Sequence, residues 1–166
     1  HPAEVRASIG YLATTTGLYG RLTPRELLRY FGQLQGVDDP HGRAEALLER
    51  FEIGSFADRP CDRLSTGMKQ KVSIARTIVH DPPVLIFDEP TIGLDVLVAR
   101  EVLKAIGKLR DQGKCIVYST HIMREVERLC DRIAIMYRGH FLSEGTLHEL
   151  LESHQQTDFE ELFFRL

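Results

Sequence analysis

Hydrophobic residues in the first half of the chain recur at the spacing of amphipathic helices, and each run begins at a polar cap. Helices are predicted to start at Thr23, near Asp39 and at Ser65. The first start reads TPRE, a capping box with proline at the first helical position. These signals predict a helical block over residues 22–81, preceded by a short strand over residues 5–12.

The hydrophobic period changes in the second half of the chain. VLIFD (residues 84–88) and CIVYS (residues 115–119) are short apolar runs rich in β-branched residues, and both predict strands buried in a parallel sheet. Helical spacing follows each run. RIAIMY and HFLSEG predict a further pair of strands, joined by the turn RGH and expected to be antiparallel. The alternation of strands and helices predicts an α/β fold with a parallel, helix-flanked sheet.

Composition and charge exclude several classes of protein. The net charge is -3 and basic residues alternate with acidic ones, so no basic surface for nucleic acid is expected. Apolar runs extend over only a few residues, so the chain is not expected to span a membrane. The three cysteines are scattered without a C-x-x-C pair, which is typical of free thiols in a reducing cytosol.

Polar residues follow the two predicted buried strands where each strand ends. Asp88 and Glu89 end the first strand, and His121 follows the second. The carboxyl ends of parallel strands meet at one edge of a sheet, where ligands bind. Asp88 could hold Mg²⁺, Glu89 could polarise a water for attack on phosphorus, and His121 could hydrogen-bond a phosphate oxygen or that water. The alternatives are a solvated acid pair and an exposed histidine at a helix start.

The start of the third predicted helix is a candidate anion site. Ser65 is the predicted N-cap, and the backbone N–H groups of Thr66, Gly67 and Met68 are expected to be free there and, together with the helix dipole, to form an anion site. Gly67 also lets a phosphate approach the backbone closely. The alternative is an ordinary serine cap. Asp95, in the sequence GLD, reads locally as a turn residue and the N-cap of the next helix.

The sequences LSTGMKQ, VLIFDEP, GLD and STH occur in this order, and together they resemble the ATP-binding subunit of ABC transporters. The resemblance runs from Val5 to about Glu144. It implies a P-loop NTPase-like α/β fold, with a helical subdomain inserted into a parallel sheet core.

The resemblance implies a role for each motif residue. Ser65 and Gly67 would bind the γ-phosphate of an ATP held by the opposite subunit, and Thr66 stands between them where the family has glycine. Asp88 would bind Mg²⁺, and Glu89 would be the base that acts on the attacking water.

Three further positions match the family. Asp95 would cross the dimer interface, and His121 would be the switch histidine. Thr14 aligns with the glutamine of the family's Q-loop, and its shorter side chain puts a direct Mg²⁺ contact in question.

The P-loop pattern G-x-x-x-x-G-K-[ST] does not occur in the sequence. The Gly-Lys pairs at Gly107 and Gly113 lack both the earlier glycine and the following hydroxyl residue. Residues 1–166 are therefore expected to be the C-terminal two-thirds of one ABC ATPase domain, inactive and unstable by themselves. The expected parts are a helical subdomain over 22–81, a core sheet over 82–145 and C-terminal helices over 146–166.

The resemblance implies an ATP hydrolase that powers an ABC-type exporter, with ATP and Mg²⁺ as cofactors. TGLYGRLTPRELLRYFGQL and FEELFFRL are most like sequences of sodium-efflux and drug-export systems. The implied partners are a membrane permease and a second copy packed head to tail, with the protein cytoplasmic and peripheral at the inner face of the cell membrane. Two alternatives stay open, an ABC ATPase that acts without transport and a degenerate remnant without catalysis.

Overall fold

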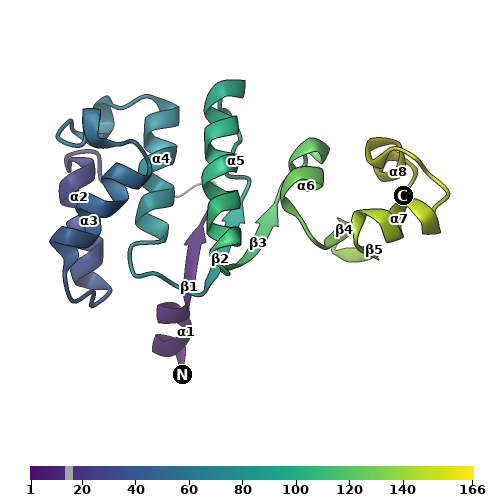
Figure 1. Ribbon diagram of the computed structural model, residues 1–166, viewed down its shortest axis with the longest axis horizontal. Helices are drawn as coiled ribbons and strands as arrows, with labels where there is room; N and C mark the ends of the chain where they lie inside the picture. Colours follow the sequence, from purple (N-terminus) through teal and green to yellow (C-terminus); the bar gives the residue numbers. More distant parts are fainter. Residues whose placement is uncertain (14–16) are drawn as a thin grey trace. The chain divides into compact units, whose positions relative to one another are not determined.

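The structure, a computed structural model, describes residues 1–13 and 17–166, and its elements divide into two units, His1–Ser119 and Thr120–Leu166 (Figure 1). The elements of the first unit are α1 (Pro2–Ser8), β1 (Ile9–Leu12), α2 (Pro24–Leu34), α3 (Pro40–Arg50), α4 (Thr66–Thr77), β2 (Val84–Asp88), α5 (Val96–Asp111) and β3 (Cys115–Ser119). Two short 3-10 turns, η1 (Gly54–Phe56) and η2 (Cys61–Arg63), join α3 to α4.

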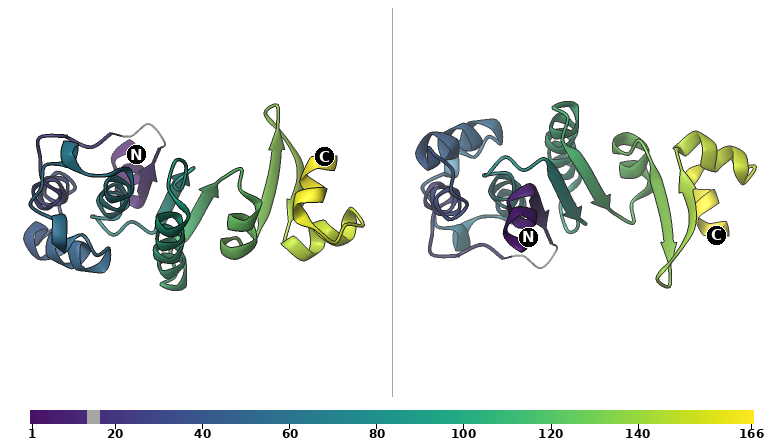
Figure 2. Two further views of the ribbon diagram at one scale, coloured as in Figure 1. Left: turned by 90° about the horizontal axis from the view of Figure 1, so that it is seen from above. Right: turned by 90° about the horizontal axis from the view of Figure 1, so that it is seen from below.

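The strands β1, β2 and β3 form the predicted parallel sheet, with β2 in the middle. Leu85 and Phe87 of β2 are fully buried on one face of this sheet. The helix α5 lies along one side of the sheet in both views of Figure 2. The helix α4 approaches β1 so closely that a Cβ at Gly10 would lie 2.5 Å from the carbonyl oxygen of Thr77. Glycine at this position therefore allows α4 to pack directly on the sheet.

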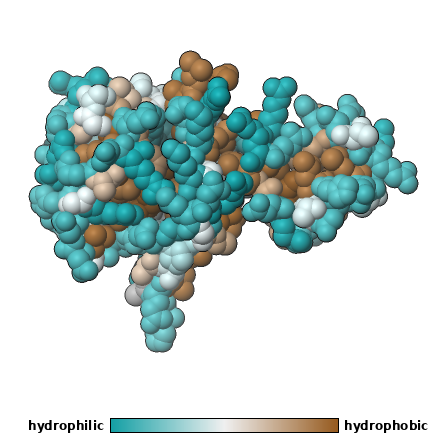
Figure 3. Space-filling view, viewed as in Figure 1, coloured by the Kyte–Doolittle hydropathy of each residue, from teal (hydrophilic) through white to brown (hydrophobic). Residues whose placement is uncertain are grey.

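The opposite face of the same sheet is open. Tyr11, Ile86 and Val117 lie in register across the three strands, and Tyr11 and Val117 are 55% and 54% exposed. The prediction that β3 is buried is wrong, because β3 is the edge strand of this sheet within the described part of the chain. Hydrophobic surface also appears at one end of α5 (Figure 3), whose first turn exposes Val96 and Leu97.

The helices α2, α3 and α4 begin at the predicted caps. The Thr23 hydroxyl accepts from the N–H of Glu26, and the Glu26 carboxylate accepts from the N–H of Thr23, which confirms the capping box. Asp39 and Ser65 cap α3 and α4 in the same way through their side-chain oxygens. These bonds satisfy N–H groups that have no partner within their own helix.

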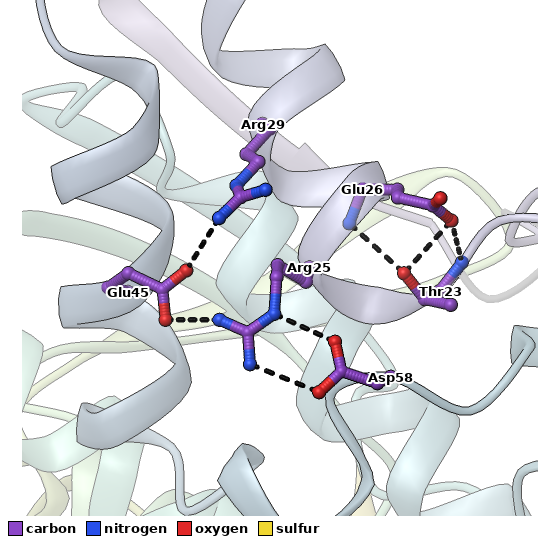
Figure 4. Close-up of polar contacts among 6 residues, drawn as sticks. All are labelled: Thr23, Arg25, Glu26, Arg29, Glu45 and Asp58. Carbon is purple, nitrogen blue, oxygen red and sulfur yellow. Dashed lines mark hydrogen bonds and ion pairs between the residues drawn. The ribbon is translucent and has the colours of Figure 1, made fainter.

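An ionic clasp, formed by Arg25, Arg29, Glu45 and Asp58, ties α2 to α3 and to the segment after η1 (Figure 4). Arg25 pairs with Glu45 and donates to both carboxylate oxygens of Asp58, at 2.8 and 3.3 Å. Arg29 Nη2 lies 3.0 Å from Glu45 Oε1. The hydrogen bonds from Arg25 lower the pKa of the Glu45 and Asp58 carboxyls.

Residues 5–8 were predicted to begin a strand, and that prediction is wrong because they end the helix α1. Val5 is 55% exposed, so no buried sheet face selects an extended conformation here. Ser8 Oγ donates to the carbonyl of Glu4 at 2.9 Å, and the acidic Glu4 lies in the first turn, where the helix dipole favours it.

The second unit contains α6 (Met123–Leu129), β4 (Ile133–Tyr137), β5 (His140–Gly145), α7 (Leu147–Ser153) and α8 (Phe159–Arg165). The strands β4 and β5 are antiparallel, as predicted, and Arg138 and Gly139 join them with positive φ angles, as a tight hairpin requires. The core of this unit consists of Val126, Ile133, Ile135, Leu150, Phe159 and Leu162. In the described part of the chain, no helix is long and apolar enough to cross a membrane.

Candidate functional site

The carboxyl end of β2 places two of the polar candidates, Asp88 and Glu89, beside Ser119 at the end of β3. Asp88 is the last residue of β2 and lies in register with Ser119 at the end of β3. Ser119 Oγ donates to Asp88 Oδ1 at 2.6 Å, and the N–H of Glu89 donates to the carbonyl of Ser119 at 3.1 Å. The predicted meeting of these strand ends at one edge of the sheet is confirmed.

The backbone turns sharply at Glu89. Its φ angle is 49°, in the left-handed region that non-glycine residues rarely adopt. The carbonyl of Glu89 accepts from the N–H of Ile92 at 3.2 Å, and Oε2 of its carboxylate is buried. Strained conformations of this kind persist where surrounding contacts hold them, and they concentrate at functional sites.

The residue Gln70 also reaches this turn, and the sequence did not point to it. Gln70 lies on α4, and its Nε2 donates to the carbonyl oxygen of Pro90 at 2.6 Å. Pro90 follows Glu89 directly and is buried. The helical spacing of α4 gives Gln70 no mark that separates it from the other polar residues of the helix.

The helix α4 starts at the predicted N-cap, but the N–H of Met68, predicted to be free, is bonded to that cap. Ser65 is the N-cap, and its hydroxyl accepts from the N–H of Met68 at 3.3 Å. Thr66 and Gly67 form the first turn, where backbone N–H groups have no carbonyl partner within the helix. A Cβ at Gly67 would lie 2.7 Å from Val98 Cγ1, so glycine also permits close packing between α4 and α5.

Asp95 is the N-cap of α5, as predicted. Its Oδ1 accepts from the N–H groups of Leu97 and Val98, each at 3.0 Å. The carboxylate is therefore held in place by the helix that it caps, at an exposed position of the loop.

His121 lies in the second unit, just before α6, and is exposed there. Thr120 organises this helix start, because its Oγ1 accepts from the N–H of Ile122 at 3.0 Å and donates to Glu125 Oε2 at 2.8 Å. Thr14, the position matched to the Q-loop, lies outside the described residues.

The residues at the end of β2 fit a magnesium ion held jointly with a substrate. A carboxylate beside a hydroxyl supplies the hard oxygen donors that Mg²⁺ prefers, and Asp88 and Ser119 form such a pair. Among the described residues, no group of three or more His, Cys, Asp or Glu side chains could hold a metal ion. Such a site would thus need the phosphate oxygens of a bound nucleotide as further ligands.

Comparisons with known proteins show the family of the chain. Residues 1–92 match the family model described as ABC transporter. The ABC transporter ATP-binding protein NatA of Bacillus subtilis (strain 168) is 41% identical over 165 residues, which are 98% of this chain and 67% of NatA. The Nod factor export ATP-binding protein I of Burkholderia lata is 36% identical, with 96% of this chain and 53% of that protein covered. The probable multidrug ABC transporter ATP-binding protein YbhF of Escherichia coli (strain K12) is 36% identical, with 89% of this chain and 26% of YbhF covered.

Two solved structures share the fold. An ATP-binding subunit of an ABC transporter superposes with a TM-score of 0.87 at 31% identity, over 99% of this chain and 70% of that one. A dimeric ATP-binding cassette in a post-hydrolysis state, bound to ADP and Pi, superposes with a TM-score of 0.77 at 26% identity, over 88% and 66%.

Proposed function

Because the chain belongs to the ABC transporter family, as an ATP-binding domain, we propose that the intact protein binds and hydrolyses ATP to power an ABC-type exporter. One observation carries this proposal. At the carboxyl end of β2, Asp88 and Glu89 are hydrogen-bonded to Ser119 of the neighbouring strand β3. The relatives named for multidrug transport and Nod factor export support the export function.

The proposed chemistry is attack of a water on the γ-phosphorus of ATP, which releases ADP and phosphate. Glu89 orients this water and accepts its proton, and Asp88 is the ligand of Mg²⁺, which neutralises charge on the phosphates when bound. His121 stabilises the transition state through a hydrogen bond to a phosphate oxygen. The buried oxygen of the Glu89 carboxylate and the bond from Ser119 to Asp88 support the assignment of the two acids.

The remaining site residues are proposed to act on an ATP held by a second copy, packed head to tail. Ser65, Thr66 and Gly67 bind its γ-phosphate. The first turn of α4 supports this, because its first backbone N–H groups have no carbonyl partner within the helix. Asp95 crosses the dimer interface, and Thr14 takes the Q-loop position. The solved dimer among the structural relatives supports this arrangement.

We further propose that residues 1–166 are the C-terminal two-thirds of one ATPase domain, with a helical subdomain over 22–81, a core sheet over 82–145 and C-terminal helices over 146–166. The chain spans 67% of NatA and contains no P-loop pattern. A strand, loop and helix that carry the P-loop would cover the open face of the sheet and the outer edge of β3. The permease is the proposed membrane partner, which places the subunit at the inner face of the membrane.

The full-length subunit with Glu89→Gln tests this proposal. ATP binding should stay within about twofold of the wild type, whereas the hydrolysis rate should fall by about 100-fold or more, because the amide cannot accept the proton. Nucleotide binding and phosphate release are the measurements. Glu49→Gln, at an exposed position of α3, is the matched control and should hydrolyse ATP normally. Undiminished ATP hydrolysis by Glu89→Gln would refute the assignment of Glu89 as the base.

A further inference from the structure

A side chain of the helix α4, that of Gln70, contacts the turn that follows β2. The distance from Gln70 Nε2 to the Pro90 carbonyl oxygen is 2.6 Å, and the bond is partly buried. The two residues are 20 positions apart in the sequence, so this is a tertiary contact and not a local cap. Gln70 is on the same helix as Ser65 and Gly67.

The turn that Gln70 contacts is strained at its first residue. Glu89 has a φ angle of 49°, and its backbone relaxes to an ordinary conformation unless other contacts prevent this. Two backbone bonds hold the turn, from the N–H of Glu89 to Ser119 and from the N–H of Ile92 to the Glu89 carbonyl. The second bond closes a four-residue turn with Pro90 and Thr91 at its central positions.

The Gln70 amide adds a restraint on this turn from a different element, the helix α4. The φ angle of proline is set by its ring, so the orientation of the Pro90 carbonyl reflects the ψ angle of Pro90 and determines how the chain continues through the turn that begins at Glu89. A donor at 2.6 Å from this carbonyl selects one orientation. Losing the donor would leave a partly buried carbonyl without this partner, and the turn would then be free to relax.

We propose that Gln70 is a positioning residue for Glu89, which holds the Glu89–Pro90 turn so that the carboxylate faces the attacking water. This inference rests on the proposed role of Glu89 as the base. It also means that the helix whose start is proposed to bind the γ-phosphate is directly bonded to the turn that carries the base.

Kinetics of the full-length subunit with Gln70→Met test the inference. Methionine keeps the size of the side chain and removes the donor. We expect kcat for ATP hydrolysis to fall about tenfold while KM for ATP stays within about twofold, because only the positioning of the base is affected. Gln33→Met, the same substitution at an exposed position of α2, is the matched control and should leave both constants unchanged.

A double-mutant cycle with Glu89→Gln separates positioning from a general structural role. If Gln70 acts through Glu89, Gln70→Met should not lower the residual rate of Glu89→Gln any further. A loss of about tenfold in both backgrounds would overturn the inference, as would an unchanged kcat for Gln70→Met alone. If Gln70→Met fails to fold, Gln70→Glu, which has the same shape but presents an acceptor to the carbonyl, is measured in its place with the same expected results.

The two proposals fail in different ways. Undiminished hydrolysis by Glu89→Gln would refute the assigned base, whatever Gln70 does. A normal rate in Gln70→Met together with an inactive Glu89→Gln would refute only the positioning role.

Discussion

At the scale of single residues, the candidate site contains two positions that go against local preference. Gly67 lies in the first turn of α4, although glycine is a poor helix former. Glu89 adopts a left-handed φ angle that favours glycine. Each exception has a cause in the surrounding structure, because Val98 leaves no room for a larger residue at position 67 and the turn after β2 is held by its neighbours.

Replacing Gly67 with alanine should destabilise the full-length subunit by about 1–3 kcal/mol, because the new methyl group must displace the Val98 side chain. The direction is informative, since alanine in a helix interior ordinarily stabilises by up to about 1 kcal/mol relative to glycine. Urea unfolding at equilibrium measures the change. Val98→Ala in the same protein should recover part of the loss.

Gly54→Ala is the control for this substitution. Nothing lies within 4 Å of a Cβ built at Gly54, so its stability should change little. If Gly67→Ala and the wild type were equally stable, the Val98 side chain would move aside for the new methyl group at no measurable cost in stability.

At the scale of helices and strands, arginine side chains connect the C-terminal end of α4 to other parts of the chain. Arg43 of α3 donates to the carbonyls of Ile78 and Val79, at 2.8 and 2.9 Å, which satisfies acceptors at the C-terminal end of α4. Arg76 is nearly buried and donates to the carbonyl of Gly17 at 3.2 Å. The helix that carries the proposed phosphate-binding turn is therefore held at its other end by hydrogen bonds to other parts of the chain.

The ionic clasp between α2 and α3 predicts a specific pH dependence. Hydrogen bonds from Arg25 lower the pKa of Glu45 and Asp58 below their ordinary values of 4.5 and 3.8. Their contribution to stability is complete at neutral pH and is lost as the pH falls through the lowered pKa values. Arg25→Gln should therefore differ most from the wild type at neutral pH and converge with it as the pH falls through the lowered pKa values of the two carboxyls.

Urea midpoints across this pH range measure the effect of Arg25→Gln. Arg128→Gln, at an exposed position of α6, should follow the wild-type curve at every pH. Parallel curves for Arg25→Gln and the wild type would mean that the clasp contributes no pH-dependent stability.

At the scale of the whole molecule, the sheet of β1, β2 and β3 has one face that the described part of the chain leaves uncovered. Tyr11 and Val117 expose apolar side chains on either side of Ile86, and β3 has an outer edge without a neighbour in the described part of the chain. An exposed edge and an apolar face promote association between copies. The proposed P-loop segment would remove both.

Val117→Lys should therefore have opposite effects in two forms of the protein. In the isolated chain of residues 1–166, the charge should reduce aggregation, because it interrupts the exposed edge. In the full-length subunit it should impair folding, because the same position would be buried. Light scattering and soluble yield are the measurements, and Val5→Lys, at an exposed position off the sheet, is the control. A monomeric, cooperatively unfolding isolated chain would contradict the first expectation.

The sequence was sufficient wherever the structure is determined locally. The caps at Thr23, Asp39 and Ser65 and the run VLIFD predicted their helices and strand correctly, because each signal lies next to the element that it specifies. The run CIVYS by itself could not indicate the exposure of β3, since the burial of a strand depends on neighbours from elsewhere in the chain. The same reason applies to Gln70, whose bond to Pro90 leaves no trace in the periodicity of α4.

The close contact between Gly67 and Val98 has an evolutionary consequence. Position 67 is under two constraints, one from the proposed ligand and one from a neighbouring side chain. A lineage that gave up ATP hydrolysis would be released from the first constraint only. Glycine should persist at position 67 while position 98 remains β-branched. It should be replaced only after position 98 has become smaller. The order of these two substitutions would therefore record how the lineage changed after it lost ATP hydrolysis.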